Sequence, residues 1–304
     1  MYENFISSTF GLFLKNKSIK EVFMEKILKK YFPFFVLPTF LVFCIVFIIP
    51  FILGIGLSFT KFTTIFNSEF VGFQNYVTAL SSGQRFGKAF VFTIIFTIIC
   101  VISINVLAFA LAVILTRKIR GKNLFRTVFF MPNLIGGIVL GYTWQVMIDS
   151  FLLKFGQTLL ANPKFGFWGL VILMNWQLIG YMMVIYIAGL QNVPPALIEA
   201  AEIDGASKWQ ILKSITIPMV MPSITICTFL TLTNSFKLYD QNLALTAGAP
   251  MYKTEMLAMN IVDTMFSRNG FEGVGQAKAV IFFIIVAFIA YLQIKLTREK
   301  EVEQ

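Results

Sequence analysis

Polar and aromatic side chains interrupt two long apolar segments of the chain, and their types suit the binding of a hydroxyl-rich solute. In the first segment, Trp176, Gln177 and Tyr181 lie within about one and a half helical turns. An aromatic face can stack on the C–H face of a sugar, and an amide can bond its hydroxyls. Because polar groups are costly in lipid, we expect these side chains to face the interior of a helix bundle or a wet path.

The second segment carries Asn234 and Lys237 three residues apart, and Asp240 follows after three more. Residues at this spacing share one face of a helix, so they form a second candidate wall for a solute. The alternative is that Asn234 bonds a neighbouring helix while Lys237 and Asp240 form an ion pair at the membrane interface. On the residue types alone, this alternative is the stronger one.

The elements that must position these residues are membrane-spanning helices. Of the 304 residues, 57% are hydrophobic and only 13% are charged, which is about half the charged fraction of an ordinary soluble domain. Apolar runs long enough to cross a bilayer predict an all-α membrane protein with six transmembrane helices. The expected spans are residues 34–57, 90–115, 124–148, 167–190, 219–236 and 277–296.

Basic residues are distributed unequally between the two sides of this membrane domain. The segments on the side of the N-terminus hold sixteen lysines and arginines, whereas the opposite loops hold seven. By the positive-inside rule, both termini are then cytoplasmic. The expected organisation is an N-terminal tail at 1–33, a membrane domain at 34–296 and a C-terminal tail at 297–304. Membrane topology therefore explains the net charge of +10 without a nucleic acid partner.

The cytoplasmic-side loop at residues 191–218 is long for so compact a protein and needs a reason. Two prolines starting at Pro194 favour a helix start, and Gly205 favours the turn that ends this first helix. Ser207 and Gln210 have the spacing of a capping box, which begins a second short helix. Pro218 should end that helix.

The residue types of this loop match a known signature, an EAA triplet followed by a glycine and an I-x-x-P ending. Its places are held by Glu199, Ala200, Ala201, Gly205, Ile215 and Pro218. The loop thereby resembles the inner-membrane permease family of binding-protein-dependent ABC importers. FVGFQNYVTAL from Phe70, RTVFFMPNLIGGIVLGYTWQ from Arg126 and LTAGAP from Leu245 extend the resemblance over most of the chain after residue 34. The LPTFLVFCIVFIIPF opening is most similar to the first permease subunit of the maltose and glycerol-phosphate class.

The resemblance implies a multi-pass permease of the bacterial cytoplasmic membrane that imports a sugar or related carbohydrate. Its implied partners are a second homologous permease, two ATP-binding ATPase subunits, an extracytoplasmic solute-binding protein and membrane lipid. The implied ATPase-coupling residues are Glu199, Ala200, Ala201, Glu202, Asp204 and Gly205. The implied substrate contacts are Trp176, Gln177, Tyr181, Asn234, Lys237 and Asp240.

The chain itself is not expected to catalyse a reaction. No G-x-x-x-x-G-K-[ST] phosphate loop occurs, so ATP hydrolysis is assigned to another chain. Histidine is absent and the three cysteines lack ligand spacing, so neither a metal nor a cofactor is expected. The main alternative is an ion-coupled secondary transporter, which would need acidic residues or histidines within its spans. The four middle spans have no acidic residue before Asp149.

Overall fold

The computed structural model describes residues 19–64, 67–117 and 119–299. The chain divides into two structural units, Met1–Gly56 and Leu57–Gln304. The described part of the first starts at helix α2 (Ile19–Phe43) and continues through the π-helical segment η1 (Cys44–Ile48) into α3 (Ile49–Leu57), whose last residue belongs to the second unit. The stretch Tyr31–Leu57 is long and apolar enough to span a membrane.

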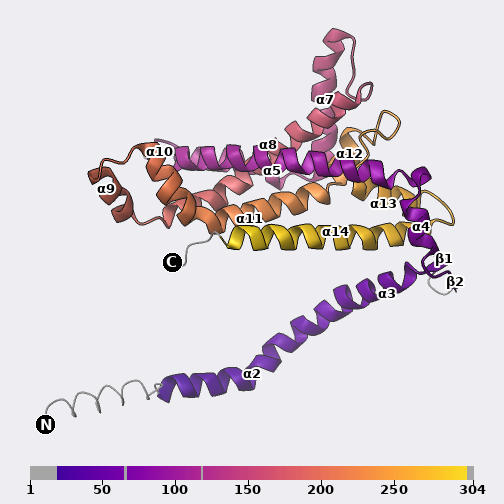
Figure 1. The fold of residues 1–304 in the computed structure, drawn as a ribbon, viewed down its shortest axis with the longest axis horizontal. Helices are drawn as coiled ribbons and strands as arrows, with labels where there is room; N and C mark the ends of the chain where they lie inside the picture. The colour runs from indigo at the N-terminus through magenta and orange to yellow at the C-terminus, as the bar shows by residue number, and fades with distance from the viewer. Residues whose placement is uncertain (1–18, 65–66, 118, 300–304) are drawn as a thin grey trace. The chain divides into compact units, whose positions relative to one another are not determined.

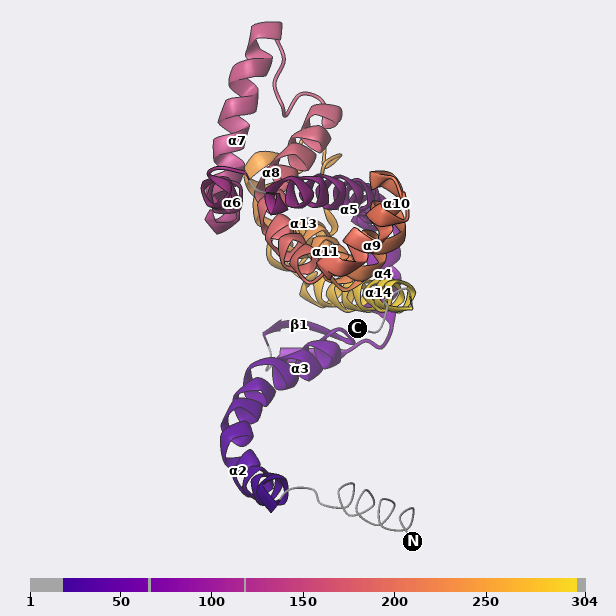
Figure 2. The same ribbon diagram turned by 90° about the vertical axis from the view of Figure 1, so that its left-hand side faces the viewer.

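The second unit is helical apart from a two-stranded antiparallel sheet of β1 (Thr60–Thr64) and β2 (Asn67–Phe70). Its long helices are α5 (Phe86–Thr116), α8 (Pro163–Gln191), α11 (Ile217–Phe236) and α14 (Glu272–Arg298). The shorter elements are α4 (Gln74–Leu80), η2 (Ser82–Gln84), α6 (Lys122–Phe130), η3 (Met131–Leu134), α7 (Gly137–Leu152), η4 (Leu153–Phe155), α9 (Pro195–Ile203), α10 (Lys208–Ile211), η5 (Leu212–Thr216), α12 (Asp240–Leu245) and α13 (Leu257–Phe266). Figures 1 and 2 show the long helices side by side, with α9 and α10 at one end.

The core of this unit forms along one face of α5. Buried residues recur at every fourth position, from Phe96 through Cys100, Ile104 and Ala108 to Ala112. Positions four apart lie above one another on a helix, so this stripe faces one side only, where α8 and α11 pack. The small residues of the stripe let the helices approach closely, as is usual between membrane helices.

The candidate membrane spans confirm the helical membrane fold and change one element of it. Among the residues that the structure describes, five helices are long and apolar enough to cross a membrane, and a sixth span exists if one bent pair is counted. The single helix expected at 124–148 is wrong, because Lys122–Leu134 and Gly137–Phe155 meet at 102°. Pro132 lacks a backbone donor and lies in the 3-10 segment η3, while Gly136 is extended. These residues explain the break.

A second difference concerns the end of the short helix after Ser207. The expectation that Pro218 ends it is wrong, because one helix runs unbroken from Lys208 to Phe236. The π-helical segment η5 joins its parts, and the Ile217 amide donates to the carbonyl oxygen of Leu212, five residues back. Such a turn absorbs the missing donor of a proline within a helix. The loop and the fifth expected span are therefore mechanically continuous.

A fully buried cation, Lys278 (0% exposed), lies near the start of α14 (Glu272–Arg298). Its Nζ donates to Thr264 Oγ1 at 2.6 Å and to Asn260 Oδ1 at 2.9 Å, both on α13. It also lies 3.3 Å from the carbonyl oxygen and from Oε1 of Gln84 in η2. These oxygens replace the water that an ammonium group loses on burial, and they join α14 to α13 and η2.

An ion-pair network lies beside this lysine. Arg85 reaches Glu255 at 3.1 Å and Asp263 at 2.9 Å, and Arg268 pairs with the same Asp263 at 2.9 Å. The Glu255 side chain also accepts a hydrogen bond from Asn260. Burial raises the pKa of Glu255 above its ordinary value, against the opposing effects of Asn260 and Arg85.

Candidate functional site

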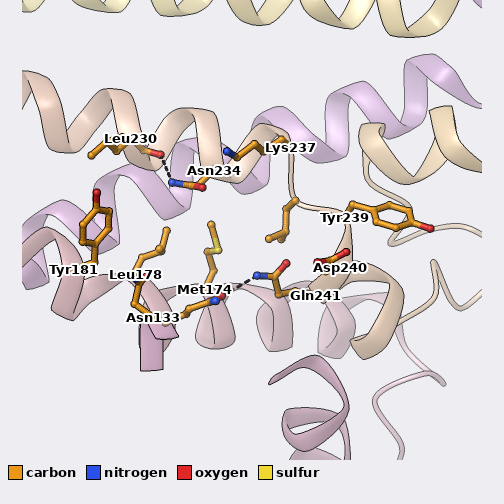
Figure 3. Close-up of a pocket in the computed structure, with 12 residues that line it drawn as sticks. Asn133, Met174, Leu178, Tyr181, Leu230, Asn234, Lys237, Tyr239, Asp240 and Gln241 are labelled. Atoms are coloured by element: carbon orange, nitrogen blue, oxygen red, sulfur yellow. Dashed lines mark hydrogen bonds between the residues drawn. The ribbon is translucent and has the colours of Figure 1, made fainter. Parts of the chain in front are cut away.

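A cavity of about 530 Å³ lies among α8, η3, α11 and α12 of the second unit. Its lining comprises Asn133, Met174, Gln177, Leu178, Tyr181, Leu230, Asn234, Lys237, Leu238, Tyr239, Asp240 and Gln241. Figure 3 shows Asn234 and Lys237 along one wall and Gln241 across from them, with Tyr181 and Tyr239 toward opposite ends. Residues from segments far apart in the sequence therefore share one polar cavity.

Glycines set the spacing of the elements around this cavity. A Cβ on Gly180 of α8 would overlap the carbonyl of Phe129, so only glycine allows α6 to cross there. On α7, a Cβ at Gly137 would come within 2.8 Å of Asp240 Cβ and 2.9 Å of Gln241 Cδ. The close approach of α12 to α7 thus positions Asp240 and Gln241.

Hydrogen bonds fix the two facing walls of the cavity. Gln241 Nε2 donates to Gln177 Oε1 at 2.9 Å, and Gln177 Nε2 donates to the carbonyl oxygen of Ile135 at 3.4 Å. On the other wall, Asn234 Nδ2 donates to the carbonyl oxygen of Leu230 at 2.8 Å (Figure 3). These bonds leave the Asn234 carbonyl oxygen and one hydrogen on each glutamine amide for a solute.

Two charged side chains lie at the same cavity without pairing to each other. Within the described residues, no ion pair joins Lys237 to Asp240. Lys237 follows the end of α11, and Asp240 begins α12, so the chain changes direction between them. The cavity consequently offers donors, acceptors, aromatic rings and one charge of each sign. This combination suits a neutral molecule with many hydroxyl groups.

The structure brings together five of the six residues predicted as substrate contacts and places the sixth elsewhere. Gln177, Tyr181, Asn234, Lys237 and Asp240 line the cavity. The lining does not include Trp176, which is 43% exposed and packs edge-on against Trp144 with 5.6 Å between ring centroids. Five residues along a helix turn through roughly 140°, so Trp176 and Tyr181 point in different directions.

One polar lining residue, Gln241, was missed by sequence reasoning. It follows a predicted span, and only the return of the chain as α12 brings it to the cavity. Asn133 and Tyr239 also line the cavity, and Asn133 belongs to the break between α6 and α7. Among the described ranges 19–64, 67–117 and 119–299, no group of three or more histidine, cysteine or carboxylate residues could hold a metal ion.

The loop at residues 191–218 forms the predicted helix, turn and helix. The amide of Gly205 donates to the carbonyl oxygen of Glu202, and that of Ala206 donates to the carbonyl oxygen of Ala201. With Gly205 at φ +79°, this is the Schellman arrangement that closes a helix. The capping box of Ser207 and Gln210 is confirmed by reciprocal bonds.

The surface of α9 is open to a partner. Glu199, Ala200, Glu202, Asp204 and Gly205 are exposed, whereas Ala201 is partly buried. Beside them, Ile203 is 86% exposed. The exposed surface of α9 thus combines one bulky apolar side chain with carboxylates and small residues.

Comparison with known proteins gives a consistent family. Residues 120–298 match the model of the family described as binding-protein-dependent transport system inner membrane component. The chain is 46% identical to a probable starch degradation products transport system permease protein of Thermoanaerobacterium thermosulfurigenes, over 88% of this chain and 94% of that protein. It is 31% identical to a multiple sugar-binding transport system permease protein of Streptococcus mutans, over 92% and 99%.

A solved structure agrees on the fold. It is a crystal structure of a bacterial ABC transporter involved in the import of the acidic polysaccharide alginate, with a TM-score of 0.76 and 19% identity. The match covers 91% of this chain and 98% of that one. The family match spans the cavity walls, the α9–α10 loop and α14 alike. The chain therefore belongs to the family of inner membrane components of binding-protein-dependent transport systems.

Proposed function

We propose that this multi-pass permease translocates a sugar or related carbohydrate through the cavity between α8, α11 and α12. The observation that carries the proposal is the lining, in which amides and tyrosines from separate segments face one space of about 530 Å³. The names of the two sequence relatives, which refer to starch degradation products and to multiple sugars, support a carbohydrate. Gln177, Tyr181, Asn234, Lys237 and Asp240 are the proposed contacts.

The proposed partners follow from two features of the chain: its sequence has no phosphate loop for ATP, and its α9 helix exposes residues that could contact another subunit. The family works with a binding protein, and in such systems the ATPase is a separate subunit. We infer a complex of this chain, a second homologous permease, two ATPase subunits and an extracytoplasmic solute-binding protein. Six residues of α9 and its turn, all exposed except the partly buried Ala201, are the proposed contact with one ATPase: Glu199, Ala200, Ala201, Glu202, Asp204 and Gly205.

The orientation follows from charge. Because lysines and arginines are concentrated on the side of the α9–α10 loop, we propose that this side and both termini are cytoplasmic. The proposed organisation is a membrane domain at 34–296 between cytoplasmic tails at 1–33 and 297–304. An ion-coupled secondary transporter is the weaker alternative, because it needs neither a binding protein nor a docking loop, whereas the family of this chain depends on a binding protein.

Uptake by the assembled complex tests this function. Proteoliposomes that contain the complex and internal ATP are supplied with the binding protein and labelled maltodextrins, and Asn234→Ala is compared with Gln145→Ala. Both changes remove an amide from a helix, but the lining includes only Asn234. Loss of one hydrogen bond and its desolvated partner predicts a several-fold fall in uptake for Asn234→Ala alone. Uptake without ATP, or equal uptake by both variants, contradicts the proposal.

A further inference from the structure

A second cavity, of about 770 Å³, opens at the end of the unit that carries the α9–α10 loop. Its walls come from the last turns of α5 and α8, from α9, and from the start of the helix that becomes α11. Leu190 and Ile198 are among its apolar residues, while Arg117, Glu202 and Lys208 bring charges to it. The cavity is distinct in residues from the one between α8, α11 and α12.

The cavity lies on a different face of α9 from Glu199, and of the proposed ATPase contacts only Glu202 lines it. Ile198 and Glu202 are four residues apart, so they share one face, and both line the cavity. Glu199 and Ile203 are likewise four apart and lie about 100° further around the helix. Neither of these two lines the cavity, and Ile203 is 86% exposed. An ATPase bound to the Glu199 face therefore leaves the Ile198 face for another occupant, and Glu202 lies between the two faces.

The depth of the cavity corresponds to the headgroup layer of a bilayer. α5 has 31 residues and the helix from Lys208 to Phe236 has 29, so each is about 45 Å long against a hydrocarbon core of about 30 Å. Arg117 directly follows α5, and Lys208 begins the second helix. Trp209, which also lines the cavity, is 69% exposed, and tryptophan is enriched at this level of a membrane.

The charges of the cavity complement an anionic headgroup. In the part of the chain that the structure describes, the side chains of Arg117 and Lys208 form no ion pair or hydrogen bond. Guanidinium and ammonium groups are the usual partners of phosphate, and basic pockets between membrane helices bind acidic lipid headgroups. Glu202 leaves a net charge of about +1 and supplies an acceptor for hydroxyl groups.

We propose that this cavity binds one anionic phospholipid of the phosphatidylglycerol type from the cytoplasmic leaflet. Arg117 and Lys208 hold the phosphate, and Glu202 accepts hydrogen bonds from the headgroup glycerol. The upper part of an acyl chain follows the apolar wall at Leu190 and Ile198. The choice of the cytoplasmic leaflet rests on the membrane orientation given in the proposed function. The choice of residues and of headgroup chemistry is independent of that orientation.

Fluorescence quenching of Trp209 measures this binding directly. The full chain carries Trp144→Phe, Trp168→Phe and Trp176→Phe, so that Trp209 is the remaining tryptophan. It is reconstituted in nanodiscs of phosphatidylcholine with increasing mole fractions of brominated phosphatidylglycerol or of brominated phosphatidylcholine. We expect saturable quenching at a lower mole fraction for phosphatidylglycerol than for phosphatidylcholine. Equal quenching by the two lipids overturns the proposal without any further variant.

Charge variants then locate the binding. Loss of one basic group near the membrane surface weakens binding of an acidic lipid by about fivefold, so Arg117→Gln with Lys208→Gln should abolish the preference. The matched control is Arg120→Gln with Lys213→Gln, because these residues are exposed at the same end and do not line the cavity. If the control pair loses the preference for phosphatidylglycerol to the same extent, the preference comes from the general surface charge, and the proposed site is overturned.

Two further readouts distinguish a bound lipid from a bound protein subunit and from the sugar pathway. Assembly with the ATPase subunits should leave the quenching in place, and its loss would assign the cavity to a protein contact instead. Sugar uptake is measured on the same complexes. A lipid preference without sugar uptake refutes the proposed function alone, whereas sugar uptake without a lipid preference refutes only the lipid site.

Discussion

The ammonium group of Lys278 lies 2.6 Å from the hydroxyl of Thr264, inside the second unit and without contact with solvent. Three more oxygen atoms, from Asn260 and Gln84, complete its surroundings. A buried cation with full hydrogen bonding holds its neighbours in one arrangement, because any displacement leaves a charge without a partner. The hydrogen bonds of Lys278 therefore hold α13, α14 and η2 rigidly together.

Lys278→Met should destabilise the protein by about 2 kcal/mol, because it leaves Asn260 Oδ1 buried without its donor, whereas the Gln84 oxygens keep donors on Asn260 and Arg268. The apolar replacement removes the cost of burying a charge, so the loss is smaller than for an unpaired ion. Thermal unfolding in detergent measures the effect. Lys295→Met is the control, since Lys295 is exposed on the same helix; a similar fall in Tm for both variants would show that the network contributes nothing specific.

The buried carboxyl group of Glu255 should make the stability of the protein depend on pH. Its folded pKa is raised by burial, so between its unfolded value of about 4.5 and the folded value the native state binds more protons than the unfolded state. The free energy of unfolding then decreases as pH rises through this window. Relative to Glu255→Gln, which cannot titrate, the wild type should lose Tm from pH 4.5 upward until Glu255 is ionised. A constant difference in Tm across this range would contradict the assignment.

Gly180→Ala should destabilise the crossing of α6 over α8. A methyl group there would overlap the backbone of Phe129, which cannot yield as a flexible side chain could. Overpacking of this kind costs about 1–3 kcal/mol, and here we expect the upper end. Gly87→Ala on α5 is the matched control, because nothing lies within 4 Å of its added Cβ. Tm and uptake should both fall for Gly180→Ala, while Gly87→Ala should leave the two unchanged.

Glu199→Lys should reduce ATP-driven uptake by about tenfold while the membrane fold persists, because charge reversal places like charges together if the ATPase surface is basic. The carboxylate is exposed on α9. Glu69→Lys makes the same change on the exposed strand β2 at the other end of the unit. Uptake and ATPase activity of the two assembled complexes are compared. Normal activity of the Glu199 variant would remove this residue from the coupling surface.

Tyr181→Ala and Trp176→Ala distinguish the cavity from the neighbouring aromatic contact. Tyr181 lines the cavity and Trp176 packs on Trp144 instead. Loss of an aromatic stacking surface is worth about 1 kcal/mol, so uptake by the Tyr181 variant should fall several-fold and its preference among sugars should change. The Trp176 variant should keep the wild-type preference. If the effects are reversed, the solute passes along the Trp176 face of α8.

Local chemistry made much of the architecture predictable from the sequence. Apolar length located all spans but the broken one at 124–148, the turn at Gly205 located the end of the first loop helix, and the capping box at Ser207 located the start of the second. These features depend on residues close together in the chain. The spacing of Asn234 and Lys237 also identified a wall of the cavity.

The features that the sequence did not predict depend on contacts between remote segments. Gln241 reaches Gln177 because α12 returns along α7, and no periodicity within α12 encodes that return. The partners of Lys278 are likewise remote, with Gln84 194 positions away. Trp176 and Tyr181 were grouped by closeness in sequence, although their helical angles separate them. Pro218 carries the usual sequence signal of a helix stop, whereas the π-helical turn before it has no clear signal.

The unbroken helix from Lys208 to Phe236 has a geometric consequence. It is about 43 Å long and behaves as a lever, with α9 attached near one end and Asn234 near the other. A tilt of about 5° around the midpoint of a helix of this length displaces each end by about 2 Å in opposite directions. Since hydrogen bonds tolerate changes of only a few tenths of an ångström, so small a rotation is enough to make or break the proposed contacts between Asn234 and a solute.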